Sequence, residues 1–230
     1  MNHEITGGEL FVGHYSASFL AKSLQKTIPL WLLFLAVQLV DILWAIFVLL
    51  GIEKVRIVPG ITASNALDLY YMPFTHSLAG AIFWSALAFR LCQFFPSLRG
   101  WRIGLLVGGG VFSHWVLDVI VHRPDLALYD NTLKMGLGLW NYRTSAFILE
   151  VAVLIAGAIL YLRTIRRKGR IIVYLCLLIL TQAVGTFLFP PPSSDRAAAL
   201  TALFFYIIFA VVAFWAEEKQ SKSHIAEAAE

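Results

Sequence analysis

The stretch SHWVLDVIVHRPD, residues 113–125, places side chains that bind metals at the end of an apolar run. His114, Asp118 and His122 follow one another at intervals of four residues, so a helix carries them on one face. Imidazole and carboxylate groups are the usual ligands of zinc and similar divalent ions. The spacing predicts a metal site, and a mutually hydrogen-bonded pair in a helix interface is the alternative explanation.

Other ionisable side chains lie in, or at the ends of, separate apolar segments. They are His14, Asp41, His76 and Glu150. An isolated charged group at the centre of a membrane helix costs roughly 2.5–3.5 kcal/mol, so such groups must be paired or bound to an ion. We therefore expect one or two divalent ions at these side chains. Zinc is the expected metal, and manganese is the alternative. The expected metal ligands are His14, Asp41, His76, His114, Asp118 and His122.

The elements that must position these residues are membrane helices. The chain of 230 residues is 59% hydrophobic and 14% charged, whereas soluble domains have about 25% charged residues. Apolar runs of a length that crosses a ~30 Å hydrocarbon core cover residues 29–50, 74–95, 103–121, 145–162, 171–189 and 197–216. The pattern predicts an all-α polytopic membrane helix bundle with six long transmembrane helices.

The predicted bundle is a single domain over residues 1–216, followed by a flexible polar tail at 217–230. Within it, the metal-site region spans 10–160 and the C-terminal helices span 170–216.

The shorter segment 9–25 is amphipathic and has two possible placements. It could lie on the membrane surface, or it could form a hairpin with the first long helix through a turn near residues 26–29. In the hairpin, His14 and Asp41 each stand about 13 residues from the turn, which is about 20 Å at ~1.5 Å per residue. We expect the hairpin, because it brings both side chains to one level.

The positive charges predict the orientation of the bundle. Twelve Lys and Arg residues fall on one side and six on the other, and the RTIRRKGR cluster at 163–170 dominates the first side. The positive-inside rule therefore puts the C-terminus in the cytoplasm and the end of the third long helix towards the outer face. The net charge of +4 reflects these loops rather than nucleic-acid binding, and we expect a bacterial cytoplasmic membrane location.

Several segments resemble the predicted membrane-bound metal-dependent hydrolase family over roughly residues 10–160. They are GHY, QLVDILW, MPFTHSL, SHWVLDVIVHRPDL and GLGLWNYRTSAFILE. The resemblance implies a metal-dependent hydrolase whose site includes the six ligands named above. The ligand order is also distantly similar to that of all-α zinc phospholipase C and P1 nuclease, which implies a phosphoester substrate. Ala146 stands where that pattern has a histidine four residues before Glu150.

The expected function is metal-assisted hydrolysis of a phosphoester in a lipid or lipid-linked substrate. Glu150 or Asp125 would serve as general base, and Arg123 and Arg143 would contact an anionic headgroup. The structural alternatives are a neutral hydrogen-bonded Glu150, a capping Asp125 and ordinary interfacial arginines.

Two other functions use the same residue types. One is a metal-ion or proton-coupled transporter, and the other is a scaffold stabilised by its metal. The ionisable groups are expected at one level rather than along a path across the bilayer, which favours the hydrolase over the transporter.

Overall fold

The computed structural model describes residues 11–227, with side chains as far as residue 217. Residues 9–10 of the expected N-terminal segment and 228–230 of the expected tail lie outside the described residues. The elements, in chain order, are η1 (Val12–His14), α1 (Tyr15–Leu24), α2 (Leu30–Val37), α3 (Leu39–Leu49), β1 (Lys54–Ile57), β2 (Leu67–Tyr71), α4 (Leu78–Cys92), α5 (Trp101–Val121), η2 (Leu139–Asn141), α6 (Arg143–Leu162), α7 (Gly169–Phe187) and α8 (Asp195–Glu227). Helix α8 thus continues into the segment expected to be a flexible tail.

Among the described residues, four helices are long and apolar enough to cross a membrane, namely α5, α6, α7 and the part of α8 over Asp195–Glu217. A fifth candidate span consists of α2 and α3, which meet at a bend of 54°. The protein is therefore a mostly helical membrane protein, as the sequence predicted, but the structure does not confirm six long helices.

Two of the expected long helices differ in the structure for local reasons. The run at 29–50 is interrupted at Gln38, which separates α2 from α3. The run at 74–95 yields only the 15-residue helix α4, because residues 74–77 form a loop and the Ser77 hydroxyl accepts a hydrogen bond from the Gly80 N–H as the helix N-cap. Hydrophobicity identified both runs, but it does not show where a helix breaks or begins.

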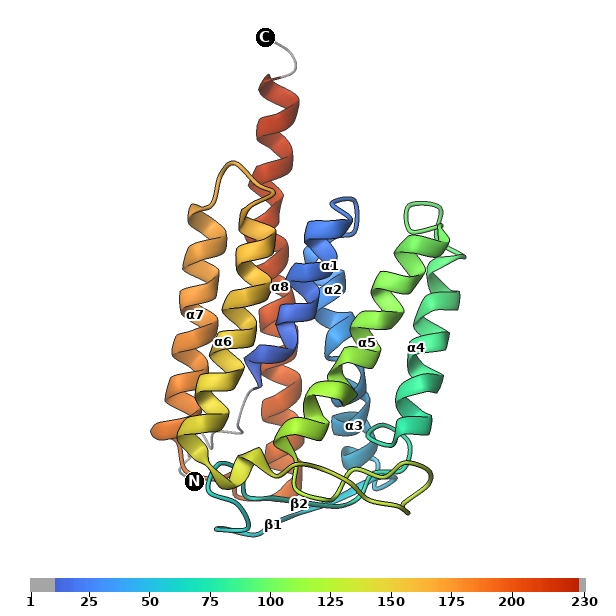
Figure 1. Ribbon diagram of the computed structural model, residues 1–230, viewed down its shortest axis with the longest axis vertical. Helices are drawn as coiled ribbons and strands as arrows, with labels where there is room; N and C mark the ends of the chain where they lie inside the picture. The colour runs from blue at the N-terminus through green and yellow to red at the C-terminus, as the bar shows by residue number, and fades with distance from the viewer. Residues whose placement is uncertain (1–10, 228–230) are drawn as a thin grey trace.

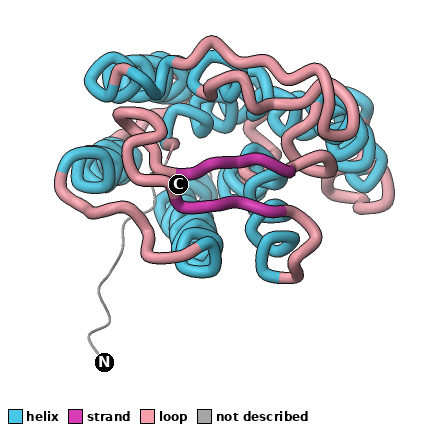
Figure 2. Tube along the Cα trace, turned by 90° about the horizontal axis from the view of Figure 1, so that it is seen from below, coloured by secondary structure: helices cyan, strands magenta, loops and turns pink. Residues whose placement is uncertain are grey.

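The helices run up and down, so that connecting loops gather at two ends (Figure 1). The α1–α2, α4–α5 and α6–α7 turns lie at the upper end, together with the end of α8. Strands β1 and β2 lie at the lower end, and Figure 2 shows them extending across it. They pair antiparallel, with Lys54 opposite Tyr71 and Arg56 opposite Asp68. The all-α prediction missed this small sheet.

Helix α1 folds back along α2 and also packs on α6 (Figure 1). The Ser18 hydroxyl donates to the Leu33 carbonyl at 3.0 Å, which joins α1 to α2. On the other side, α1 approaches α6 so closely that a Cβ at Gly157 would overlap the carbonyl oxygen of Ser16. These two contacts fix α1 and thereby hold His14, the residue that precedes it, in the interior of the bundle.

Candidate metal centre

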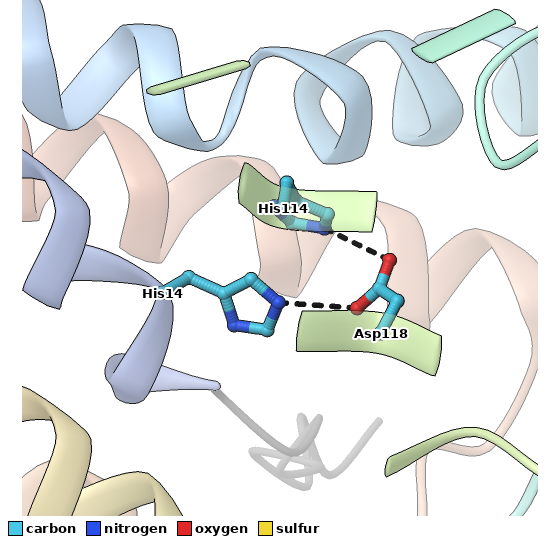
Figure 3. Close-up of side chains that lie close together, drawn as sticks. All are labelled: His14, His114 and Asp118. Atoms are coloured by element: carbon cyan, nitrogen blue, oxygen red, sulfur yellow. Dashed lines mark hydrogen bonds and ion pairs between the residues drawn. The ribbon is translucent and has the colours of Figure 1, made fainter. Parts of the chain in front are cut away.

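Four imidazole rings surround the carboxylate of Asp118, which projects from α5. His14 Nε2 lies 3.1 Å and His122 Nε2 lies 3.7 Å from Asp118 Oδ1. His114 Nε2 lies 3.4 Å and His76 Nε2 lies 3.8 Å from Asp118 Oδ2. Figure 3 shows His14 and His114 turned towards this carboxylate from separate elements. All five side chains are buried.

Asp41 supplies a second carboxylate to the same cluster. It lies in the first turn of α3, where the positive end of the helix dipole favours a negative charge. Its Oδ1 is 3.0 Å from His76 Nε2 and 3.4 Å from His114 Nε2. The structure therefore brings together all six of the side chains expected to bind a metal.

Backbone carbonyls orient two of the histidines. His14 Nδ1 lies 3.1 Å from the Phe11 carbonyl oxygen, and His114 Nδ1 lies 2.9 Å from that of Val37. Val37 is the last residue of α2, so its carbonyl has no partner within that helix. Since a carbonyl can only accept, both Nδ1 atoms carry the proton and Nε2 of the neutral ring keeps its lone pair.

The third histidine, His122, is oriented by Asp125. The carboxylate Oδ1 of Asp125 accepts from His122 Nδ1 at 2.9 Å, and its Oδ2 accepts from Arg123 Nε at 3.1 Å. Arg123 also donates to Asp68 Oδ1. Asp68 is buried on β2 and pairs with Arg56 as well.

The fourth histidine, His76, is oriented through Thr75 and Glu53. The Thr75 hydroxyl donates to Glu53 Oε2 at 2.6 Å, so its oxygen accepts from His76 Nδ1 at 2.8 Å. Glu53 Oε1 also accepts the backbone N–H groups of Phe74 and Thr75, both at 2.9 Å. Burial raises the pKa of Glu53 above its ordinary value, an effect opposed by the hydrogen bonds that Glu53 accepts from Thr75 and Phe74.

These contacts leave Nε2 of all four rings directed at two carboxylates, so Nε2 presents a lone pair in the neutral ring and donates a proton in the imidazolium form. Two groups have ligand atoms within 4.8 Å of one another: His14, His114 and Asp118 form the first, and Asp41, His76 and His114 form the second. Within the described chain, Asp118 Oδ2 is buried and lacks a hydrogen-bond donor. Lone pairs and carboxylates cannot face one another stably in a low-dielectric interior, whereas a divalent cation fits this nitrogen and oxygen donor set.

Glu150 does not belong to either group. Its Oε2 accepts the backbone N–H of Gly13 at 2.7 Å, and a Cβ at Gly13 would lie 2.5 Å from that oxygen. Glu150 therefore holds the chain immediately before His14. Arg143 lies at the surface, where its Nε donates to the Ala63 carbonyl at 2.6 Å.

Sequence reasoning missed Tyr206 on α8. Its hydroxyl donates to Asp41 Oδ2 at 2.5 Å and is buried with it. The only signal in the sequence is a single phenol within the apolar run FFYIIF. Thr75 and Glu53 were missed as well. No sequence pattern indicates that Thr75 contacts His76 or that Glu53 accepts a hydrogen bond from Thr75.

A narrow cavity of about 40 Å³ adjoins the cluster. Its polar wall includes Asp41, Asp118 and Tyr206, and its apolar wall includes Ala198 and Ala202 of α8. The cluster is thus accessible to a small group from within the bundle. The chain matches no family model, no curated protein sequence and no solved structure.

Proposed function

We propose that this protein is a membrane-embedded metal-dependent hydrolase that acts on a phosphoester of a lipid or lipid-linked substrate. One observation carries the proposal: four histidines of the cluster have Nδ1 engaged by a fixed acceptor and Nε2 directed at a carboxylate. Hydrogen bonds of this kind fix the tautomer and orientation of metal-ligating histidines.

The proposed cofactor is zinc, with manganese as the alternative, and the proposed stoichiometry is two ions. Asp41, His76 and His114 would hold one ion, and His14 and His122 the other. Asp118 would contribute one oxygen to each, because its Oδ1 faces His14 and His122 while its Oδ2 faces His76 and His114. When bound, divalent ions supply Lewis acidity that activates water and polarises a phosphoryl oxygen.

Hydrolysis needs a base and a means of holding the ligands in place. Water attack forms one P–O bond and breaks the P–O bond to the alcohol, which leaves with a proton. Of the two candidate bases, Asp125 has both oxygens engaged, by His122 and Arg123. We therefore assign the base to Glu150, which would accept the proton of the attacking water, while Arg123 keeps Asp125 and His122 in position.

The proposed location follows from charge and from the arrangement of the bundle. The Lys/Arg-rich turns, including the 163–170 cluster, lie at one end of the bundle (Figure 1). Strands β1 and β2 lie at the opposite end. The positive-inside rule supports a cytoplasmic C-terminus, a site towards the outer face and a bacterial cytoplasmic membrane. A site at that depth, with an apolar cavity wall, is suited to a membrane lipid.

A metal-ion or proton-coupled transporter is the second candidate, and the break between α2 and α3 favours it. Broken helices line the binding sites of many transporters, and this break supplies the Val37 carbonyl that orients His114.

The two candidates can be separated with purified protein. Elemental analysis of the detergent-solubilised protein should give divalent metal in stoichiometric amount, and this protein should hydrolyse a lipid phosphoester in a chelator-sensitive manner. Asp118→Asn should lose both properties, whereas Asp195→Asn, at the exposed start of α8, should keep both. Metal uptake into liposomes without any phosphoester hydrolysis would support the transporter instead, and a metal-free protein would exclude the hydrolase.

A further inference from the structure

Three residues that line the cavity beside the metal cluster each carry a buried N–H donor without an acceptor in the part of the chain that the structure describes. The donors are Trp44 Nε1, Asn65 Nδ2 and Trp140 Nε1. Each of these residues is at most 5% exposed. Buried donors are normally hydrogen-bonded, so three at one cavity are unusual and point to an acceptor that the protein itself does not provide.

The identity of each group as a donor is well defined. An indole N–H can only donate. Asn65 Oδ1 accepts the backbone N–H of Leu67 at 2.9 Å, and this bond distinguishes the side-chain oxygen from Nδ2. All three groups are neutral, so they can bind an anion without an opposite charge of their own.

The three residues come from different elements but converge on the cluster. Trp44 lies on α3 and its ring is 6.4 Å from that of His76, centroid to centroid. Trp140 lies on η2 and its ring is 4.0 Å from that of His122. Asn65 lies in the loop before β2. The two indoles thus pack directly against two of the proposed metal ligands.

We propose that Trp44, Asn65 and Trp140 bind the terminal oxygens of a phosphoryl group held at the metal centre. This inference rests on the proposed function, because without a cation the carboxylates of Asp41 and Asp118 would repel an anion from the same cavity. Two divalent ions would exceed the charge of these two carboxylates and make the cavity attractive to an anion.

The size of the cavity and the number of donors favour a phosphoryl over an acyl group. At about 10–15 Å³ for each water-sized group, the volume of about 40 Å³ accommodates about three such groups. A phosphate monoester has three terminal oxygens, one for each donor. A carboxylic ester has a single carbonyl oxygen and would leave two buried donors without partners. Phe11 and Leu67, which also line the cavity, would contact the apolar part of a substrate.

The test measures ligand binding rather than turnover. Trp44→Phe and Trp140→Phe remove an N–H and keep an aromatic ring, and Asn65→Asp replaces the donor with an oxygen while retaining the acceptor for Leu67. Trp115→Phe is the matched control, because Trp115 Nε1 is also buried without an acceptor in the described chain but Trp115 does not line the cavity. Metal-loaded proteins in detergent are titrated calorimetrically with inorganic phosphate and with dihexanoyl phosphatidic acid, and their metal content is measured.

We expect each of the three variants to bind both ligands about tenfold more weakly with unchanged metal content, and the control to bind like the wild type. Tighter binding of the phosphatidic acid would identify a lipid as the source of the phosphoryl group, and equal affinities would identify the free anion. Wild-type affinity in the three metal-loaded variants would overturn the inference. A wild-type protein without metal would instead refute the proposed function. If one tryptophan variant does not fold, the other and Asn65→Asp decide the outcome.

Discussion

The Tyr206 hydroxyl donates to Asp41 Oδ2 at 2.5 Å across 165 residues of sequence. This bond joins α8 to the first turn of α3 and leaves Asp41 Oδ1 facing His76 and His114. The last helix therefore takes part in building the metal centre, although its sequence contains no metal-ligating side chain within the membrane.

Tyr206→Phe should weaken metal binding about 10–100-fold, the usual effect of losing a partner that orients a ligand. Competition with a fluorescent chelator would measure this change. Tyr174→Phe is a matched control, since Tyr174 is also buried and donates to a backbone carbonyl, that of Phe209, at 2.6 Å. Equal affinities in the two variants would show that Tyr206 has no role in orienting Asp41.

His114→Ala should lose one of the two proposed ions, because His114 would hold that ion together with Asp41 and His76. His76→Ala should lose the same ion, and His14→Ala should lose the other. Elemental analysis of the three purified proteins gives the comparison. Full metal content in His114→Ala would contradict the assignment of the centre.

Thr75→Val should also lower metal affinity, by about 10–100-fold, because it removes the hydroxyl that lies between Glu53 and His76 Nδ1. Valine has nearly the same shape as threonine, so packing should be conserved. Thr75→Ser keeps the hydroxyl and should bind metal like the wild type. Chelator competition on both variants tests the role, and a Thr75→Val protein with wild-type affinity would exclude it.

Glu150→Gln should keep its metal but lose hydrolysis by about 10²–10⁴-fold, as expected for the loss of a general base. The glutamine oxygen can still accept the Gly13 N–H that Glu150 binds at 2.7 Å, so the position of His14 should be conserved. Metal content and turnover are measured on the same preparation. Unchanged values of both would leave Glu150 with only a structural role.

The orientation can be tested with single cysteines in a protein whose Cys92 and Cys176 are replaced by serine. Ser194→Cys lies at the end of the bundle that carries β1 and β2, and Ser97→Cys lies in the α4–α5 turn at the other end; both positions are exposed. An impermeant maleimide added to intact cells should label the cysteine at 194 and spare the one at 97. The opposite labelling pattern would reverse the proposed topology.

The sequence alone determined the properties that depend on local spacing and composition. The apolar runs indicated membrane helices, because about 20 apolar residues are needed to cross a bilayer as a helix. The spacing of His114 and Asp118 placed both on one face of α5, because four residues make about one helical turn. Ionisable groups in apolar segments indicated the side chains that needed a partner, but not which partner each would meet.

Tertiary structure decided everything that depends on contacts between distant segments. The break at Gln38 frees the Val37 carbonyl for His114, and neither the bend nor its partner follows from hydrophobicity. Tyr206 reaches Asp41 only because α8 packs against α3. Likewise, Glu53 orients His76 through Thr75 because residues 53 and 75 flank the β1–β2 hairpin. Hydrogen bonds act over about 3 Å in space, so their partners are set by packing and not by distance along the chain.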